Sequence, residues 1–221
     1  MDCEAGILVY NFVRMMNSEE ITEEKSMKKL WLLRHGQTMF NRKDMVQGQC
    51  DSPLSDLGIE QAKAAGAYIK EMDIHPDHIY TSDLPRTRQT LEQFYDGPST
   101  PVRGLRERSY GILEGESNTM LGYAFEDPEM LVKCRLEDND HLIPRVTNTL
   151  KEIMDQPENQ EVLCVVHGDM MMNFARSIDP EEMEKLERMR NCIIFEFDYD
   201  ENTRTFSNVR IHQEFLDKAG L

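Results

Sequence analysis

Two short apolar runs, each followed at once by histidine and glycine, constrain the fold more than any other feature of the chain. Leu30 to Leu33 runs into Arg34-His35-Gly36, and Val162 to Val166 runs into His167-Gly168. An unbroken apolar run of this length is typical of a strand that is buried on both faces of a parallel sheet. Ligands of such sheets bind at the carboxyl ends of the strands. We therefore expect His35 and His167 to lie at one functional edge of a parallel sheet.

Amphipathic helical patterns alternate with these runs. Ser55 can cap a helix with an inward face made of Gly58, Ala62, Ala65, Ile69 and Met72. His78 to Tyr80 forms a further short strand pattern, and a helix follows from about Arg86 to Phe94. Helical patterns also flank the Val162 run, with inward residues Leu142, Val146, Leu150 and Ile153 before it and Met171, Phe174 and Ile178 after it. This alternation indicates an α/β fold.

The end of the chain has a different pattern. Segments 192–199 and 205–211 flank Asp200-Glu201-Asn202, which favours an antiparallel hairpin. The whole pattern therefore predicts a three-layer α/β/α fold with a mostly parallel sheet, an antiparallel edge strand and a small helical cap.

Three segments make up the predicted organisation. Residues 1–26 form an N-terminal extension, and residues 27–221 form a single domain with a cap insertion at roughly 115–141, an acidic and weakly periodic stretch. The extension is interpreted as a product of an upstream start codon or as a loosely attached tail. The alternative is an added strand at a sheet edge or an oligomer contact, because Ile7 to Tyr10 is apolar.

Charge and cysteine content exclude several classes of function. With 25 Lys and Arg against 41 Asp and Glu, the formal net charge is −16. Such a charge repels nucleic acid and anionic membranes, so an anionic substrate needs a local basic pocket. No apolar run is long enough to span a bilayer. The 5 cysteines form no CxxC pair, which favours a reduced, cytoplasmic protein without a disulfide framework or a zinc knuckle.

The run Arg34-His35-Gly36-Gln37-Thr38 resembles the signature of the histidine phosphatase superfamily, in the branch that contains the phosphoglycerate mutases. Further blocks of that family follow in the same order and span residues 30 to 191. They are Asn41, Gln47-Gly48, Asp51, Pro53-Leu54, Gly58, Gln61-Ala62, Ser82-Asp83-Leu84, Arg86-Thr87, Thr90, Leu105-Arg106-Glu107, Gly111, Glu114-Gly115, Val166-His167-Gly168 and Asn191.

The resemblance implies a role for each of these positions. His35 is the nucleophile and carries the phosphoryl group, since a neutral imidazole is a good nucleophile near pH 7. Glu107 is the general acid and base; without the resemblance, an ion pair with Arg103, Arg106 or Arg108 on a solvated loop would explain it better. The groups that surround the phosphoryl group are Arg34, Arg86 and, if protonated, His167, and the substrate-binding positions are Asn41, Gln47, Gly48 and Gly168. This mechanism uses no metal and no cofactor.

One block separates phosphatases from mutases in this family. The cofactor-dependent mutases carry a lysine that closes the block after the glutamate, whereas this chain has Ser109 in place of a histidine and Glu116-Ser117-Asn118 at the end of the block. The sequence therefore predicts a phosphomonoesterase acting on a small phosphorylated metabolite. The alternatives are mutase-type phosphoryl transfer and an inactive family member acting as a binding protein. The substrate stays open among sugar phosphates, nucleotides and phosphoglycerates, and a homodimer is one candidate assembly.

Overall fold

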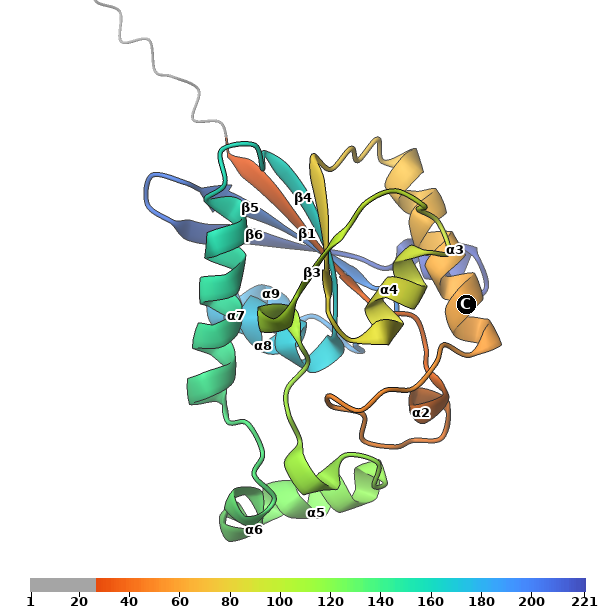
Figure 1. Ribbon diagram of the computed structural model, residues 1–221, viewed down its shortest axis with the longest axis vertical. Helices are drawn as coiled ribbons and strands as arrows, with labels where there is room; N and C mark the ends of the chain where they lie inside the picture. The colour runs from red at the N-terminus through yellow and green to blue at the C-terminus, as the bar shows by residue number, and fades with distance from the viewer. Residues whose placement is uncertain (1–26) are drawn as a thin grey trace, which may run out of the picture.

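The computed structural model describes residues 27–221, which form a six-stranded mixed sheet in the order β3-β2-β4-β1-β5-β6 (Figure 1). The strands are β1 (Lys28–Arg34), β2 (His78–Ser82), β3 (Thr100–Val102), β4 (Glu161–Val166), β5 (Ile194–Asp200) and β6 (Thr205–His212). The first four are parallel, whereas β5 is antiparallel to both β1 and β6. The predicted α/β fold with a mostly parallel sheet and an antiparallel edge is thus confirmed.

Helices cover both faces of the sheet (Figure 1). One face packs against α7 (Asn139–Met154), α8 (Gly168–Ile178) and α9 (Pro180–Glu184), and the other against α3 (Asp56–Glu71), α4 (Pro85–Leu91) and α10 (Glu214–Lys218). Strand β1 alternates between the two cores. Leu30 and Leu32 belong to the core under α7 and α8, and Trp31 and Leu33 belong to the core under α3 and α10. This double burial explains why β1 has no polar residue between Leu30 and Leu33.

The start of α3 agrees with the prediction, but its end does not. The Ser55 hydroxyl accepts a hydrogen bond of 3.1 Å from the Gly58 amide and caps the helix. Met72, which the helical period places on the buried face, is 46% exposed. The helix ends at Glu71, so Met72 is its C-cap and lies beyond the last turn that packs on the sheet.

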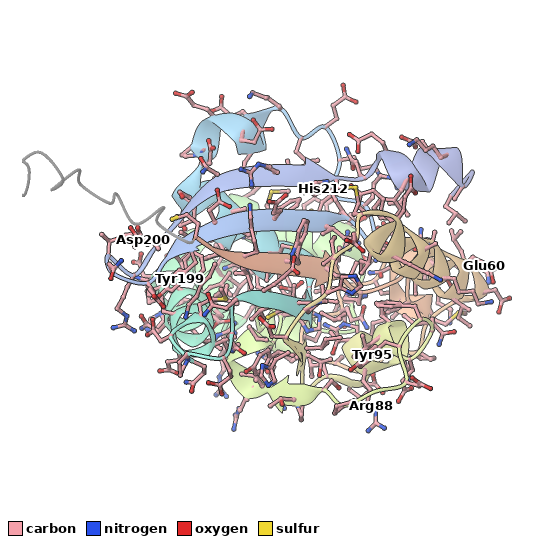
Figure 2. All side chains as sticks on the ribbon, turned by 90° about the horizontal axis from the view of Figure 1, so that it is seen from above. Glu60, Arg88, Tyr95, Tyr199, Asp200 and His212 are labelled. Atoms are coloured by element: carbon pink, nitrogen blue, oxygen red, sulfur yellow. The ribbon has the colours of Figure 1, made fainter. Side chains whose placement is uncertain are left out.

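The predicted antiparallel hairpin is present as β5 and β6. In Figure 2, Tyr199 and Asp200 mark the end of β5, and His212 marks the end of β6. The Asp200 carboxylate accepts a 3.0 Å hydrogen bond from the Asn202 amide, which stabilises the turn.

Two helices lie beyond one end of the sheet, at the bottom of Figure 1: α5 (Asn118–Glu126) and α6 (Pro128–Lys133). They surround a small apolar cluster of their own, centred on Leu113, Ala124 and Cys134. The remaining short helices are α2 (Met39–Arg42), η1 (Arg103–Leu105) and η2 (Gly111–Leu113). Because α7 begins at Asn139, the last residues of the expected cap segment, 115–141, belong to that helix. The domain division stays a prediction, and the N-terminal extension with Ile7 to Tyr10 lies outside the described residues.

Replacing Phe174 by alanine tests the core beneath α8. This side chain is fully buried, and its ring centroid lies 5.2 Å from those of Phe197 and Phe206. We expect Phe174→Ala to lower the free energy of unfolding by about 3–5 kcal/mol, because a cavity replaces the ring. Urea denaturation measures the change. The matched control is Val132→Ala, a truncation at a 79% exposed position, which should shift stability by less than about 0.5 kcal/mol; equal losses in the two variants would contradict this description of the core.

Candidate active site

The two strand-end histidines lie side by side. Parallel pairing of β1 with β4 sets Arg34 beside Val166, and the His35 amide donates a 3.0 Å hydrogen bond to the Val166 carbonyl. The rings of His35 and His167 are therefore only 5.3 Å apart between centroids and are packed edge to face at 63°. Both residues are buried. The sheet thus brings together two imidazoles that are more than a hundred residues apart in the chain.

Hydrogen bonding fixes the tautomer of His35. Its Nδ1 lies 2.8 Å from the Gly36 carbonyl oxygen. A carbonyl can only accept, so Nδ1 carries the proton and Nε2 keeps its lone pair. Burial, together with the positive charges of Arg86 and Arg34, holds the pKa of His35 well below its usual value. The ring is therefore neutral at physiological pH and can act as a nucleophile through Nε2.

Arg86 fixes the state of His167. The Arg86 Nε donates a 3.1 Å hydrogen bond to Nδ1 of His167, so Nδ1 must be the unprotonated nitrogen and Nε2 carries the hydrogen. Burial and the neighbouring Arg86 charge lower the pKa of His167 well below its usual value. The positive charge that the sequence analysis considered for His167 is therefore not available in the ligand-free protein. His167 instead offers a neutral N–H donor.

The loop after α2 holds Arg86 in place. This arginine is 1% exposed, and its guanidinium donates to the Gly48 carbonyl at 2.6 Å and to the Cys50 carbonyl at 2.9 Å. Gly48 has a φ of +52°, and a Cβ there would lie 2.4 Å from a carboxylate oxygen of Glu114. Burial lowers the pKa of Arg86 only to about 10, so it stays charged at neutral pH. Gly48, predicted as a substrate contact, thus lies where it orients the arginine.

Three buried nitrogen donors of the predicted site residues have no partner. Among residues 27–221, the buried side-chain polar atoms without a hydrogen bond include Arg34 Nε, Gln47 Nε2 and His167 Nε2. A buried polar group without a partner costs about 1–3 kcal/mol, so three among the predicted site residues require an explanation. All three are donors, and an anion with several oxygen atoms supplies the acceptors that they lack. The arrangement is that of a site for an oxyanion.

Arg34 and Gly168 fit closely against each other. The Arg34 Nη1 donates to the Met189 carbonyl at 2.6 Å, and a Cβ on Gly168 would lie 2.8 Å from Arg34 Nε. Only glycine therefore lets this guanidinium lie against the first turn of α8. As the first residue of that helix, Gly168 also has an amide without an intrahelical acceptor, which suits an anion. Asn41 accepts from the Thr38 amide and from Asn191, which leaves its own NH₂ group as a donor.

Glu107 caps helix α8 from a distant segment. Its carboxylate accepts hydrogen bonds from the amides of Asp169 at 3.0 Å, Met170 at 2.8 Å and Arg108 at 2.9 Å. Burial, and then the charge of Asp169, raise the pKa of Glu107, and the three amides partly offset this rise. The ion pair with Arg103, Arg106 or Arg108 considered from the sequence does not form. A buried carboxyl with a raised pKa is suited to gaining and losing a proton near neutral pH.

Asp169 is a site residue that the sequence reasoning missed. Its carboxylate accepts from Arg108 Nε, from the Tyr110 hydroxyl at 3.0 Å and from Asn173 at 2.8 Å. The signal was its position directly after His167-Gly168, at the start of the helix. An aspartate there is explained equally well by the helix dipole, so the sequence alone does not select it.

A pocket of about 360 Å³ is lined by some of these groups. Of the predicted residues, Arg34, Asn41, Glu107 and Gly168 line it, and α5 contributes Asn118 and Leu121. His35, Arg86, His167, Gln47 and Gly48 are buried and do not belong to its lining. A larger hollow of about 800 Å³ beside α4 and β3 contains none of the predicted site residues.

A neutral histidine with a free lone pair, set among unpaired donors at the strand ends of a parallel sheet, defines a phosphoryl-transfer type of site. The family model described as "Histidine phosphatase superfamily (branch 1)" matches residues 30–212, and the chain belongs to this family.

Relatives of this family carry the names of both mutases and phosphatases. A "Probable phosphoglycerate mutase GpmB" of Escherichia coli O1:K1 / APEC is 33% identical over 189 residues, covering 80% of this chain and 87% of its own. The structure of a phosphoglycerate mutase from Bacillus anthracis str. Sterne is similar, with a TM-score of 0.73 and 25% identity over 90% of this chain and 99% of its own. A phosphoserine phosphatase from Entamoeba histolytica shares the fold, with a TM-score of 0.67, 24% identity, and 82% and 96% coverage.

Two features are absent from residues 27–221. No group of three or more His, Cys, Asp or Glu side chains in this part of the chain is arranged to hold a metal ion. No helix within the same range is long and apolar enough to cross a membrane.

Inorganic phosphate should bind to the unpaired donors and stabilise the fold. At a concentration of ~100 times its dissociation constant, phosphate should add about 2.7 kcal/mol to the free energy of unfolding. Thermal or urea denaturation with and without phosphate measures this gain. We expect Arg86→Met to lose the phosphate-dependent gain, because it removes the buried charge. The control Arg88→Met replaces a side chain on the same helix that is 75% exposed, and it should keep the gain. A full gain in Arg86→Met would place the anion elsewhere.

Proposed function

We propose that this protein is a phosphomonoesterase that hydrolyses a small phosphorylated metabolite through a phosphohistidine on His35, with Glu107 as the general acid and base. The observation that carries the proposal is the set of unpaired N–H donors around a neutral imidazole. A phosphoryl group supplies oxygen acceptors for Arg34, Gln47 and His167, and the lone pair on His35 Nε2 supplies the nucleophile. Metal and cofactor are absent from the proposed mechanism.

In the first step, the lone pair of His35 Nε2 attacks phosphorus. A phosphorus–nitrogen bond forms, and the bond from phosphorus to the ester oxygen breaks. Glu107, protonated at this stage, gives its proton to the departing oxygen, and the alcohol leaves. Arg34 and Arg86 neutralise charge on the transferring group, while His167 and the Gly168 amide donate as neutral groups.

In the second step, water replaces the alcohol. Glu107, now a carboxylate, takes a proton from the water as its oxygen bonds to phosphorus. The phosphorus–nitrogen bond breaks, its electron pair returns to Nε2, and inorganic phosphate leaves. Glu107 is again protonated and His35 again neutral, so the cycle closes without any other reactant.

Mutase-type transfer is the alternative, and the names of two of the relatives described above favour it. A mutase must retain the phosphorylated intermediate, so it needs cations for the second anionic group of its substrate. Among the residues that line the pocket, Arg34 is the only cation, and Asn118 lies where the mutase block carries lysine. This lining supports hydrolysis. We propose that α5 and α6 act as the cap that selects the alcohol.

The first test is whether His35 becomes phosphorylated. We expect brief incubation with a ³²P-labelled ester to give an acid-labile, base-stable label on the protein. His35→Ala should lose the label and reduce kcat by at least about 10³-fold, since the nucleophile has gone. His78→Ala, an exposed histidine outside the site, is the control. Turnover that EDTA abolishes, or full activity of His35→Ala, would contradict the proposal. Phosphate binding without turnover would favour an inactive binding protein, and transfer that requires 2,3-bisphosphoglycerate would favour a mutase.

The second test concerns the proton on Glu107. We expect Glu107→Gln to lower kcat/KM for an alkyl phosphate by about 10²–10⁴-fold, because an alkoxide needs a proton to leave. The same variant should lose much less activity with p-nitrophenyl phosphate, because nitrophenolate leaves unprotonated. In the wild type, kcat/KM should fall as the pH rises through the raised pKa of Glu107, and the variant should lose this fall. Equal losses with both esters would show that Glu107 only caps α8.

A further inference from the structure

We propose that the pocket selects phosphomonoesters of uncharged or cationic alcohols, and that Asp169 is the residue that sets this specificity. The inference rests on the proposed phosphatase activity and adds the substrate class. It follows from the partners of the charged side chains near Glu107.

Each arginine next to Glu107 is already occupied by protein groups. Arg108 donates to Asp169, to the Glu137 carbonyl at 2.5 Å and to Asn139 at 2.6 Å, so each of its three nitrogens faces a protein acceptor. Arg106 pairs with both carboxylate oxygens of Asp83, at 2.6 and 2.8 Å. Neither Arg106 nor Arg108 is therefore free to bind a carboxylate or a second phosphate of the substrate.

Arg145 is occupied in the same way. Its guanidinium pairs with Glu137 at 2.8 Å and donates to the carbonyls of Gly104 and Arg106. The three arginines thus form a supporting layer for the loop that carries Glu107, and none of them belongs to the pocket lining.

Besides Arg34, the side chains that line the pocket are apolar, neutral polar or acidic, and none of them is a second cation. Met45, Val46, Leu121, Met172 and Met189 supply apolar surface from four separate segments. Methionine side chains adapt to varied ligand shapes, which suits an alcohol with some apolar surface. The acidic groups of the lining are Glu107 and Asp169.

Asp169 presents its charge to the pocket. Its side chain is 31% exposed and is fixed by the contacts from Arg108, Tyr110 and Asn173. A carboxylate on the alcohol would lie against this fixed negative charge and gain no cation in return, whereas a hydroxyl or an ammonium group would be accepted. Arg188 is a further cation near this end of the pocket, because its charge interacts with that of Arg34; it is exposed and does not line the pocket.

A matched pair of esters tests the inference: para-carbamoylphenyl phosphate and para-carboxyphenyl phosphate, which have the same shape but differ by one negative charge. We expect the wild type to prefer the carbamoyl ester in kcat/KM. Asp169→Asn should reduce this preference by about tenfold, which corresponds to about 1.4 kcal/mol. Because both esters are compared within one variant, any effect of Asp169 on the proton of Glu107, and the intrinsic reactivity of each ester, cancels from the change in the ratio.

Two further variants complete the design. Glu60→Gln removes a charge from the outer surface of α3, where Figure 2 shows it at the edge of the molecule, and it should leave the ratio unchanged. Leu121→Lys adds a cation at the pocket and should raise the relative activity on the carboxyl ester, which gives a second test should Asp169→Asn fail to fold.

The outcomes separate this inference from the proposed function. Hydrolysis of neither ester by the wild type would overturn both. Hydrolysis through a labelled His35 with no preference, with a preference for the carboxyl ester, or with a ratio that Asp169→Asn leaves unchanged would overturn the specificity alone. In the second of these cases, loss of the preference in Arg188→Ala would identify Arg188 as the anchor.

Discussion

The buried guanidinium of Arg86 is the group on which the rest of the site depends. It is fully enclosed and makes no direct ion pair with a carboxylate among residues 27–221; its partners are two carbonyls and one imidazole. These contacts fix the loop at Gly48 and Cys50 and the tautomer of His167. Together with burial, its charge also lowers the pKa of His35. A buried charge without a counterion is costly, so the fold carries a site that a bound anion stabilises.

Helix α8 shows how a requirement for folding and a chemical role can share the same atoms. Its N-cap residue, His167, makes no side-chain cap hydrogen bond, and the carboxylate of Glu107 takes that place instead. The contact joins the loop before α5 to the start of α8, so one interaction positions both the Glu107 carboxyl and the first turn of that helix. Burial and the charge of Asp169 raise the pKa of this carboxyl, and the hydrogen bonds of the contact partly offset the rise. Under the proposed mechanism, stability of the helix and proton transfer therefore depend on the same group.

The sequence predicted those features that depend on neighbouring residues or on regular sheet geometry. The double burial of β1, the Ser55 cap of α3 and the meeting of His35 with His167 follow from periodicity, capping chemistry and the geometry of parallel sheets. The neutral state of His167 and the use of Gly48 to hold Arg86 do not, because they depend on contacts between segments far apart in the chain. The sequence did not single out Asp169 for the same reason. Its carboxylate is held by Arg108 and Tyr110, which lie about 60 residues earlier in the chain and meet it only in the folded structure.

The positive charge of the site is local, because the chain as a whole carries a formal net charge of −16. In the ligand-free protein, burial and then the charges of Arg86 and Arg34 hold the pKa of His35 low, which leaves its imidazole neutral. In the proposed mechanism, the same charges neutralise the phosphoryl group, which would otherwise repel a nucleophile. Arg106, Arg108 and Arg145 are paired with carboxylates, so they bring no free cation to the pocket. Under the proposed specificity, a substrate with a single anionic group is held by Arg34 and Arg86, and a second anionic group would face Asp169.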